Sequence, residues 1–178
     1  MFRASLIAAS AALAVVSATA PTTALAQASD VDLARFDGRW FEIERNHNNV
    51  QKDCSRAQID FTPRDAADRY AIAVTCTRRN DGRVETLRAN ARVTDTATNA
   101  KFRFSLTGLL SFGGLAGQNY WVYDHASDYS WAIMGLPDKS NWWIWHRNQN
   151  ASQAERDRIL SRVRALGFST SRVVHTGL

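Results

Sequence analysis

The side chains that could do acid–base or metal chemistry are few and scattered. The four histidines have no metal-ligand spacing, so no metal site is predicted; they are His47, His125, His146 and His175. Glu42 and Glu44 lie two positions apart and could share one face of a strand, where paired carboxylates exchange protons. We favour for both either a solvated role or a role at one end of the fold. Without a nucleophile elbow or a phosphate loop, the sequence predicts no enzyme and no cofactor.

The two cysteines, Cys54 and Cys76, are candidates for a disulfide. Alternating segments on either side of a turn predict a β-hairpin in which Ile59 faces Ile72. In that register the cysteines fall within one residue of facing each other, and a β-bulge could absorb the offset. The alternative is a reactive free thiol, although neither cysteine has a neighbouring histidine that would activate it.

The first residues of the chain predict export. A positive start at Arg3, an apolar stretch over 5–18 and an Ala-Leu-Ala site at 24–26 are typical of a secretory signal peptide. We expect a signal peptide over 1–26 and one domain over 27–178. The alternative is a membrane anchor, but the apolar run is shorter than the roughly 20 residues that span a bilayer. With no cysteine near the cleavage site, we expect a soluble periplasmic or secreted protein without a lipid anchor.

The net charge of +5 becomes +4 when Arg3 is removed with the signal peptide, since that segment carries no other charge. This excess is modest and spread along the chain, so nucleic acid is not an expected partner. Transient contact with an anionic membrane surface is compatible with it.

Alternation with period two dominates the chain from Trp40 to about Trp145 and indicates half-buried strands. The clearest runs lie at 58–61, 70–74, 101–106, 120–123, 131–134 and 142–145. Short turn sequences separate them, which favours antiparallel hairpins. A helix should follow, beginning after Ser152 in an S-x-x-E capping box and ending at Gly167. Its apolar stripe is Ile159, Leu160, Val163 and Leu166, with four arginines mostly off the stripe.

Aromatic side chains are the most informative feature of the composition. Six Trp, eight Phe and four Tyr lie mostly in the region of predicted strands. Such residues either fill a core or form the walls of an apolar pocket. An eight-stranded barrel has just enough interior for side chains or for one small ligand, so both interpretations stay open.

Three ordered motifs and the end of the chain resemble the lipocalin family. Residues 36–45 (FDGRWFEIER) resemble its opening G-x-W signature, in the form found in the bacterial lipocalin and apolipoprotein D-like group. Residues 119–122 with 128–129 resemble the second conserved region, and 143–147 (WIWHR) the third. The helix and 167–171 also resemble the end of the bacterial members.

The resemblance implies an all-β fold: an eight-stranded antiparallel up-and-down barrel, or calyx, with one amphipathic helix packed outside. It also implies structural roles for Gly38, which lets the chain enter the first strand, and for Trp40, which closes one end of the barrel. Arg147 would lie across the Trp40 ring in a cation–π contact.

The implied function is non-catalytic binding, transport or storage of a small hydrophobic ligand, most simply a fatty acid or lysophospholipid. Alternation and the implied topology together predict an inward-facing, ligand-binding set: Ile59, Phe61, Tyr70, Ile72, Val74, Phe102, Phe104, Tyr120, Val122, Trp131, Ile133, Trp143 and Trp145. The apolar, glycine-rich segment 109–117 is interpreted either as a ligand portal or as an ordinary hairpin connection. The alternatives are a cysteine-dependent isomerase, which needs a free inward thiol, and a haem or pigment carrier with His47 or His125 at the mouth.

Overall fold

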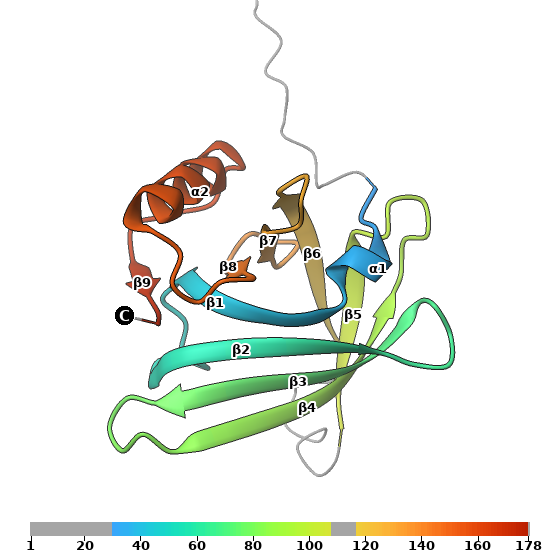
Figure 1. Ribbon diagram of the computed structural model, residues 1–178, viewed down its shortest axis with the longest axis horizontal. Helices are drawn as coiled ribbons and strands as arrows, with labels where there is room; N and C mark the ends of the chain where they lie inside the picture. Colours follow the sequence, from blue (N-terminus) through green and yellow to red (C-terminus); the bar gives the residue numbers. More distant parts are fainter. Residues whose placement is uncertain (1–29, 108–116, 178) are drawn as a thin grey trace, which may run out of the picture.

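The computed structural model describes residues 30–107 and 117–177 (Figure 1). A short helix, α1 (Leu33–Phe36), precedes the strands, and a longer helix, α2 (Gln153–Ala165), follows them. The barrel strands are β1 (Gly38–Asn46), β2 (Cys54–Pro63), β3 (Arg69–Arg78), β4 (Val84–Val93), β5 (Lys101–Leu106), β6 (Gln118–His125), β7 (Trp131–Gly135) and β8 (Trp142–His146).

Each barrel strand pairs antiparallel with its neighbour in sequence, and β1 closes the ring by pairing with both β2 and β8. Closure leaves the eight strands with no free edge. The predicted eight-stranded up-and-down barrel with an external helix is therefore confirmed. One further strand, β9 (Val173–His175), was not predicted; it lies outside the barrel and pairs with β1 (Figure 1).

The hairpin of β2 and β3 has a different register from the predicted one. Ile59 pairs with Val74 and Phe61 with Ile72, so the partners are shifted by two residues. A shift of two leaves every side chain on its predicted face, and alternation alone cannot detect it. The disulfide is confirmed, because Cys54 and Cys76 are bonded with their Cα atoms 5.5 Å apart. A register shift just after Cys54 supplies the predicted bulge.

Two hydrophobic clusters lie on opposite sides of the barrel wall. The inner cluster contains Trp40, Phe61, Phe102 and Trp143, among others. The outer cluster lies between β7, β8 and α2. Most of the predicted inward-facing set belongs to the inner cluster or packs against it.

Trp131 and Ile133 are exceptions, and their predicted inward placement is wrong. Both belong to the outer cluster, and Trp131 lies beneath two arginines of α2. Their neighbours Ala132 and Met134 face inward instead. Every residue of β7 is buried, because the barrel interior covers one face and α2 the other. Alternation could not tell the two faces apart.

Helix α2 follows its predicted boundaries. Ser152 caps it by accepting a hydrogen bond from the Glu155 backbone N–H, and Gly167 ends it with a φ of +82°. Of the four arginines predicted to lie mostly off the apolar stripe, Arg156 is on the buried face, with only 1% of it exposed. Its guanidinium donates hydrogen bonds to the carbonyl oxygens of Ile43 (2.6 Å) and Ala151 (3.1 Å), which ties the helix to β1.

Candidate ligand-binding site

One end of the barrel is closed by the residues of the sequence signature. The Trp40 ring is fully buried, and its Nε1 donates to the Phe36 carbonyl oxygen at 2.8 Å. The Arg147 guanidinium carbon lies 3.7 Å from the Trp40 ring centroid, a cation–π contact worth about 0.5–2 kcal/mol. Gly38 has a φ of +89°, which side-chain-bearing residues rarely adopt.

Arg147 also holds the short helix α1 over this floor. Its guanidinium donates to the carbonyl oxygens of Arg35 (2.7 Å), Asp37 (2.8 Å) and Arg39 (2.7 Å). Three carbonyl acceptors fix the plane of the guanidinium over the indole. Trp40 and Arg147 therefore lie where the resemblance placed them, and they close the barrel rather than line a site.

Aromatic rings fill the half of the interior next to this floor. Phe61 lies 5.1 Å from Phe36, 5.9 Å from Tyr70 and 5.9 Å from Phe102, measured between ring centroids. Edge-on arrangements of this kind are favourable packing. Six members of the predicted ligand-binding set are buried in this packed half, and their contacts are with the core: Ile59, Phe61, Tyr70, Ile72, Phe102 and Val122.

The other half of the interior has apolar side chains that stay partly exposed. Val74, Phe104 and Tyr120 of the predicted set pack against the inner cluster without being fully buried. Leu106 joins them and was missed, although it continues the alternation of Phe102 and Phe104 along β5. The Tyr120 ring lies 4.6 Å from Phe104 and 5.6 Å from Trp143. The open half is thus lined by apolar and aromatic groups that water can reach.

A buried polar cluster lies on the β1 side of the interior. The Glu42 carboxylate accepts a hydrogen bond from Gln51 Nε2 at 2.8 Å and forms an ion pair with Arg45 Nε at 3.1 Å. Trp143 Nε1 donates to Gln51 Oε1 at 2.7 Å. Burial raises the pKa of Glu42 to about 7, against the opposing effect of Arg45, and it lowers the pKa of the Arg45 guanidinium.

The favoured solvated role of the two glutamates is wrong, and so is the idea that they share one face. A register shift in β1 separates them, so Glu42 pairs with inward Trp145 and Glu44 with outward Ile144. Glu44 is buried under β9, where its carboxylate lies 2.9 Å from His175 Nδ1. Burial raises its pKa, while the hydrogen bond to His175 lowers it. The two carboxylates therefore cannot act on one substrate atom.

The histidines are dispersed in the structure as well. His125 stacks on Tyr129 at 4.4 Å, and the Tyr129 hydroxyl accepts from the Asp32 N–H beside α1, so His125 lies at the closed end rather than at the mouth. His146 is buried with its Nε2 3.4 Å from Glu155, and His47 is exposed after β1. Within residues 30–107 and 117–177 there is no group of three metal-ligating side chains.

Cys54 and Cys76 are the two cysteines of the chain and are bonded to each other. The isomerase alternative requires a free inward-facing thiol, and neither cysteine provides one in this structure. The predicted portal, 109–117, lies outside the described residues except for Gly117. No helix of the described part of the chain is long and apolar enough to cross a membrane.

An eight-stranded antiparallel barrel, floored by a tryptophan under an arginine and backed by one external helix, defines the lipocalin class. The chain belongs to this family: the model of the lipocalin-like domain matches residues 31–177. This fold supports the binding of small hydrophobic ligands.

Solved structures with a similar fold include crustacyanin subunits. Apocrustacyanin C2 has a TM-score of 0.60 at 13% identity, with 85% of this chain and 88% of that chain covered. Lobster apocrustacyanin A1 has a TM-score of 0.60 at 12% identity, with the same coverage of 85% and 88%. H1 crustacyanin from the lobster Homarus americanus has a TM-score of 0.57 at 12% identity, covering 85% and 87%. At these identities the likeness shows the fold alone. No curated protein matches the chain.

Proposed function

We propose that this chain binds a small amphipathic lipid, a fatty acid or a lysophospholipid, without covalent chemistry in the open half of the barrel. The observation that carries the proposal is the set of inward apolar side chains that remain partly exposed: Val74, Phe104, Leu106 and Tyr120. Exposed apolar surface inside a barrel is costly unless something covers it, and a lipid chain would do so. Trp143 of β8 adjoins this wall, with its ring 5.6 Å from that of Tyr120, whereas Trp145 is buried in the inner cluster.

The packed floor sets the direction in which the ligand enters. Aromatic rings occupy the half next to Trp40, so the tail would point toward Phe61 and Phe102 and the head group toward the open end. Each buried methylene contributes about 0.8 kcal/mol, which corresponds to roughly a fourfold gain in affinity. The affinity of a fatty-acid series should therefore rise with chain length until the tail reaches the packed rings.

The test is the binding of a fluorescent fatty acid to two matched tryptophan variants. Val74→Trp adds a large side chain to the open half, whereas Val84→Trp adds it to a strand position that is 64% exposed and adjoins the β3–β4 turn. We expect at least a tenfold loss of affinity for Val74→Trp and less than a twofold change for Val84→Trp. Unchanged affinity in Val74→Trp would show that the ligand binds elsewhere.

Native mass spectrometry of protein purified without detergent gives a second readout. We expect a non-covalent adduct with the mass of a fatty acid or lysophospholipid, or uptake of an added one. A protein that carries no lipid and takes none up would remove the proposed function.

We also propose that the chain acts after export, in the periplasm or outside the cell, as a soluble protein without a lipid anchor. The disulfide between Cys54 and Cys76 supports an oxidising compartment. The signal peptide over 1–26 lies outside the described residues and stays a prediction. The mass of the protein recovered from the periplasm or the medium should correspond to a chain that starts at Gln27. Protein found only inside the cell with Met1 intact would contradict export.

A further inference from the structure

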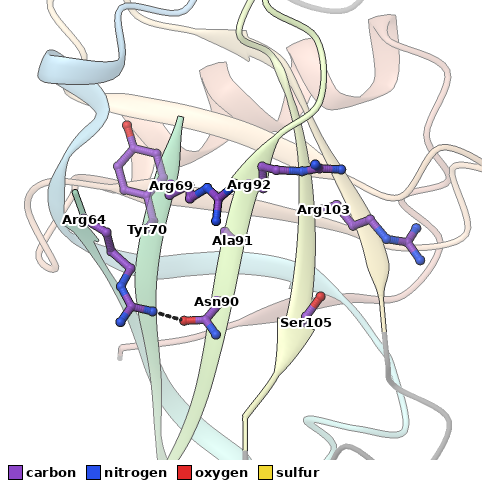
Figure 2. Close-up of a pocket in the computed structure, with 8 residues that line it drawn as sticks. All are labelled: Arg64, Arg69, Tyr70, Asn90, Ala91, Arg92, Arg103 and Ser105. Atoms are coloured by element: carbon purple, nitrogen blue, oxygen red, sulfur yellow. Dashed lines mark hydrogen bonds between the residues drawn. The ribbon is translucent and has the colours of Figure 1, made fainter. Parts of the chain in front are cut away.

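A row of arginines crosses the outer face of the barrel, on the side opposite to the proposed lipid. Arg69 of β3 pairs directly with Arg92 of β4, and Arg92 pairs directly with Arg103 of β5. Figure 2 shows these three side chains in a row across the strands, with Arg64 beside them. We refer to Arg64, Arg69, Arg92 and Arg103 as the arginine row.

This arrangement is unfavourable for the fold by itself. Like charges directly opposite each other on neighbouring strands are destabilising. Carboxylates lie only at one end of the row: Asp68 is 4.0 Å from Arg69, and Asp65 lines a second hollow with Arg64 and Arg69. In the described part of the chain no ion pair joins Arg64, Arg92 or Arg103 to an acidic side chain. Arg69 keeps 63% of its side chain exposed. The row therefore presents several positive charges that the protein itself leaves unneutralised.

Neutral groups orient two of these guanidiniums. Arg64 Nη1 donates to Asn90 Oδ1 at 2.7 Å, and Arg103 Nη1 donates to Asn119 Oδ1 at 3.3 Å. An amide oxygen fixes the direction of a guanidinium without cancelling its charge. Gly117 makes room for the same group, because a Cβ atom at that position would lie 2.3 Å from Arg103 Nη2. Orientation without neutralisation is what an anion site requires.

The row borders a hollow of about 240 Å³, which also has Asn90 and Ser105 in its lining. Neighbouring strands lie about 4.8 Å apart, so the row from Arg69 to Arg103 spans about 10 Å. Guanidinium groups bind phosphate oxygens in a bidentate manner. From the register, the missing counter-charges and the hollow, we propose that the arginine row binds a compact ligand with two or three adjacent phosphate groups. The hollow also borders Tyr70 and Ala91 of the inner cluster, but the arginine side chains lie on the outer face, so the proposed anion site does not depend on the lipid.

The experiment is titration calorimetry with sodium tripolyphosphate at a fixed ionic strength of about 0.1 M, where surface charges are partly screened. The variant Arg69→Gln/Arg92→Gln/Arg103→Gln removes three charges from the row. The matched control, Lys52→Gln/Arg79→Gln/Arg172→Gln, removes three exposed charges elsewhere. We expect at least a tenfold loss of affinity in the first variant and less than threefold in the control. No binding by the wild type, or equal losses in both variants, would overturn the proposal.

If the triple variant does not fold, the single variant Arg92→Gln still tests the proposal. It removes the central charge of the row, so at low salt its melting temperature should rise while its affinity for tripolyphosphate falls. A lower melting temperature would show that the row stabilises the fold and is not kept for binding. A second experiment measures whether the protein sediments with vesicles of phosphatidylglycerol. If it sediments with the vesicles but does not bind tripolyphosphate, the row binds a membrane surface, and the proposal of a compact phosphate ligand is overturned.

Discussion

Two parts of the barrel wall, one on each side of the molecule, differ in how many faces of their strands are covered. Strands β7 and β8 are buried along their whole length, because the interior covers one face and α2 the other. Strands β4 and β5 are covered on one face only, and their outer face carries exposed polar residues, including Arg92 and Arg103 of the arginine row. Double coverage makes a side chain important for stability on either face. Single coverage leaves the outer face free for charge and the inner face free for a ligand.

The largest effect that this comparison predicts is at the floor. Trp40 is fully buried on β1, which belongs to the covered side, so Trp40→Ala should lower the free energy of unfolding by about 3–5 kcal/mol. Trp121 on β6 is only partly buried, so Trp121→Ala should cost clearly less. Urea denaturation of both variants measures the difference. Trp121 packs against the outer cluster without being fully buried, so equal losses would mean that full burial gives Trp40 no special role in stability.

The next effect is a pH dependence that arises from the buried glutamate. The pKa of Glu42 is raised by burial from 4.5 to about 7, so between these values the folded state holds a proton that the unfolded state releases. Its contribution therefore lowers the free energy of unfolding as pH rises through this range, by about 3 kcal/mol in total. Glu42→Gln should flatten the dependence, measured by denaturation at pH 4.5 and pH 8.

Glu85 provides the control, because it lies on β4, where the strands are covered on one face only. Its carboxylate is 54% exposed, so Glu85→Gln should leave the pH dependence of the wild type in place. If Glu42→Gln keeps the full dependence, another buried group is responsible.

The difference between the two sides also explains which features could be predicted. Alternation identifies a face only where one face meets water, so Phe102 and Phe104 were placed correctly. On β7 both faces are apolar, and Trp131 and Ile133 were placed on the wrong one. The helix was predictable because its cap, stripe and stop are local signals.

Other features depend on contacts between distant parts of the chain. β4 gave no clear alternating run, because two of its inward residues are Ala89 and Ala91. The separation of Glu42 from Glu44 rests on an irregularity in β1 that the side-chain pattern does not mark. The arginine row rests on strand register, and a shift of two residues in one hairpin leaves every predicted face unchanged while changing each partner.

The smallest expected effects separate stability from binding. Ile133 is fully buried beneath α2, so Ile133→Val should lower the free energy of unfolding by about 1 kcal/mol and leave lipid affinity unchanged. Val74 is partly exposed in the open half, so Val74→Ala should change stability by less than about 1 kcal/mol. Its affinity for a fatty acid should fall about threefold to tenfold, because the lost methyl groups would contact the tail. Denaturation and fluorescent-lipid titration of the two variants measure both quantities. If Ile133→Val weakened binding and Val74→Ala did not, the ligand would lie on the helix side of the wall and not in the barrel.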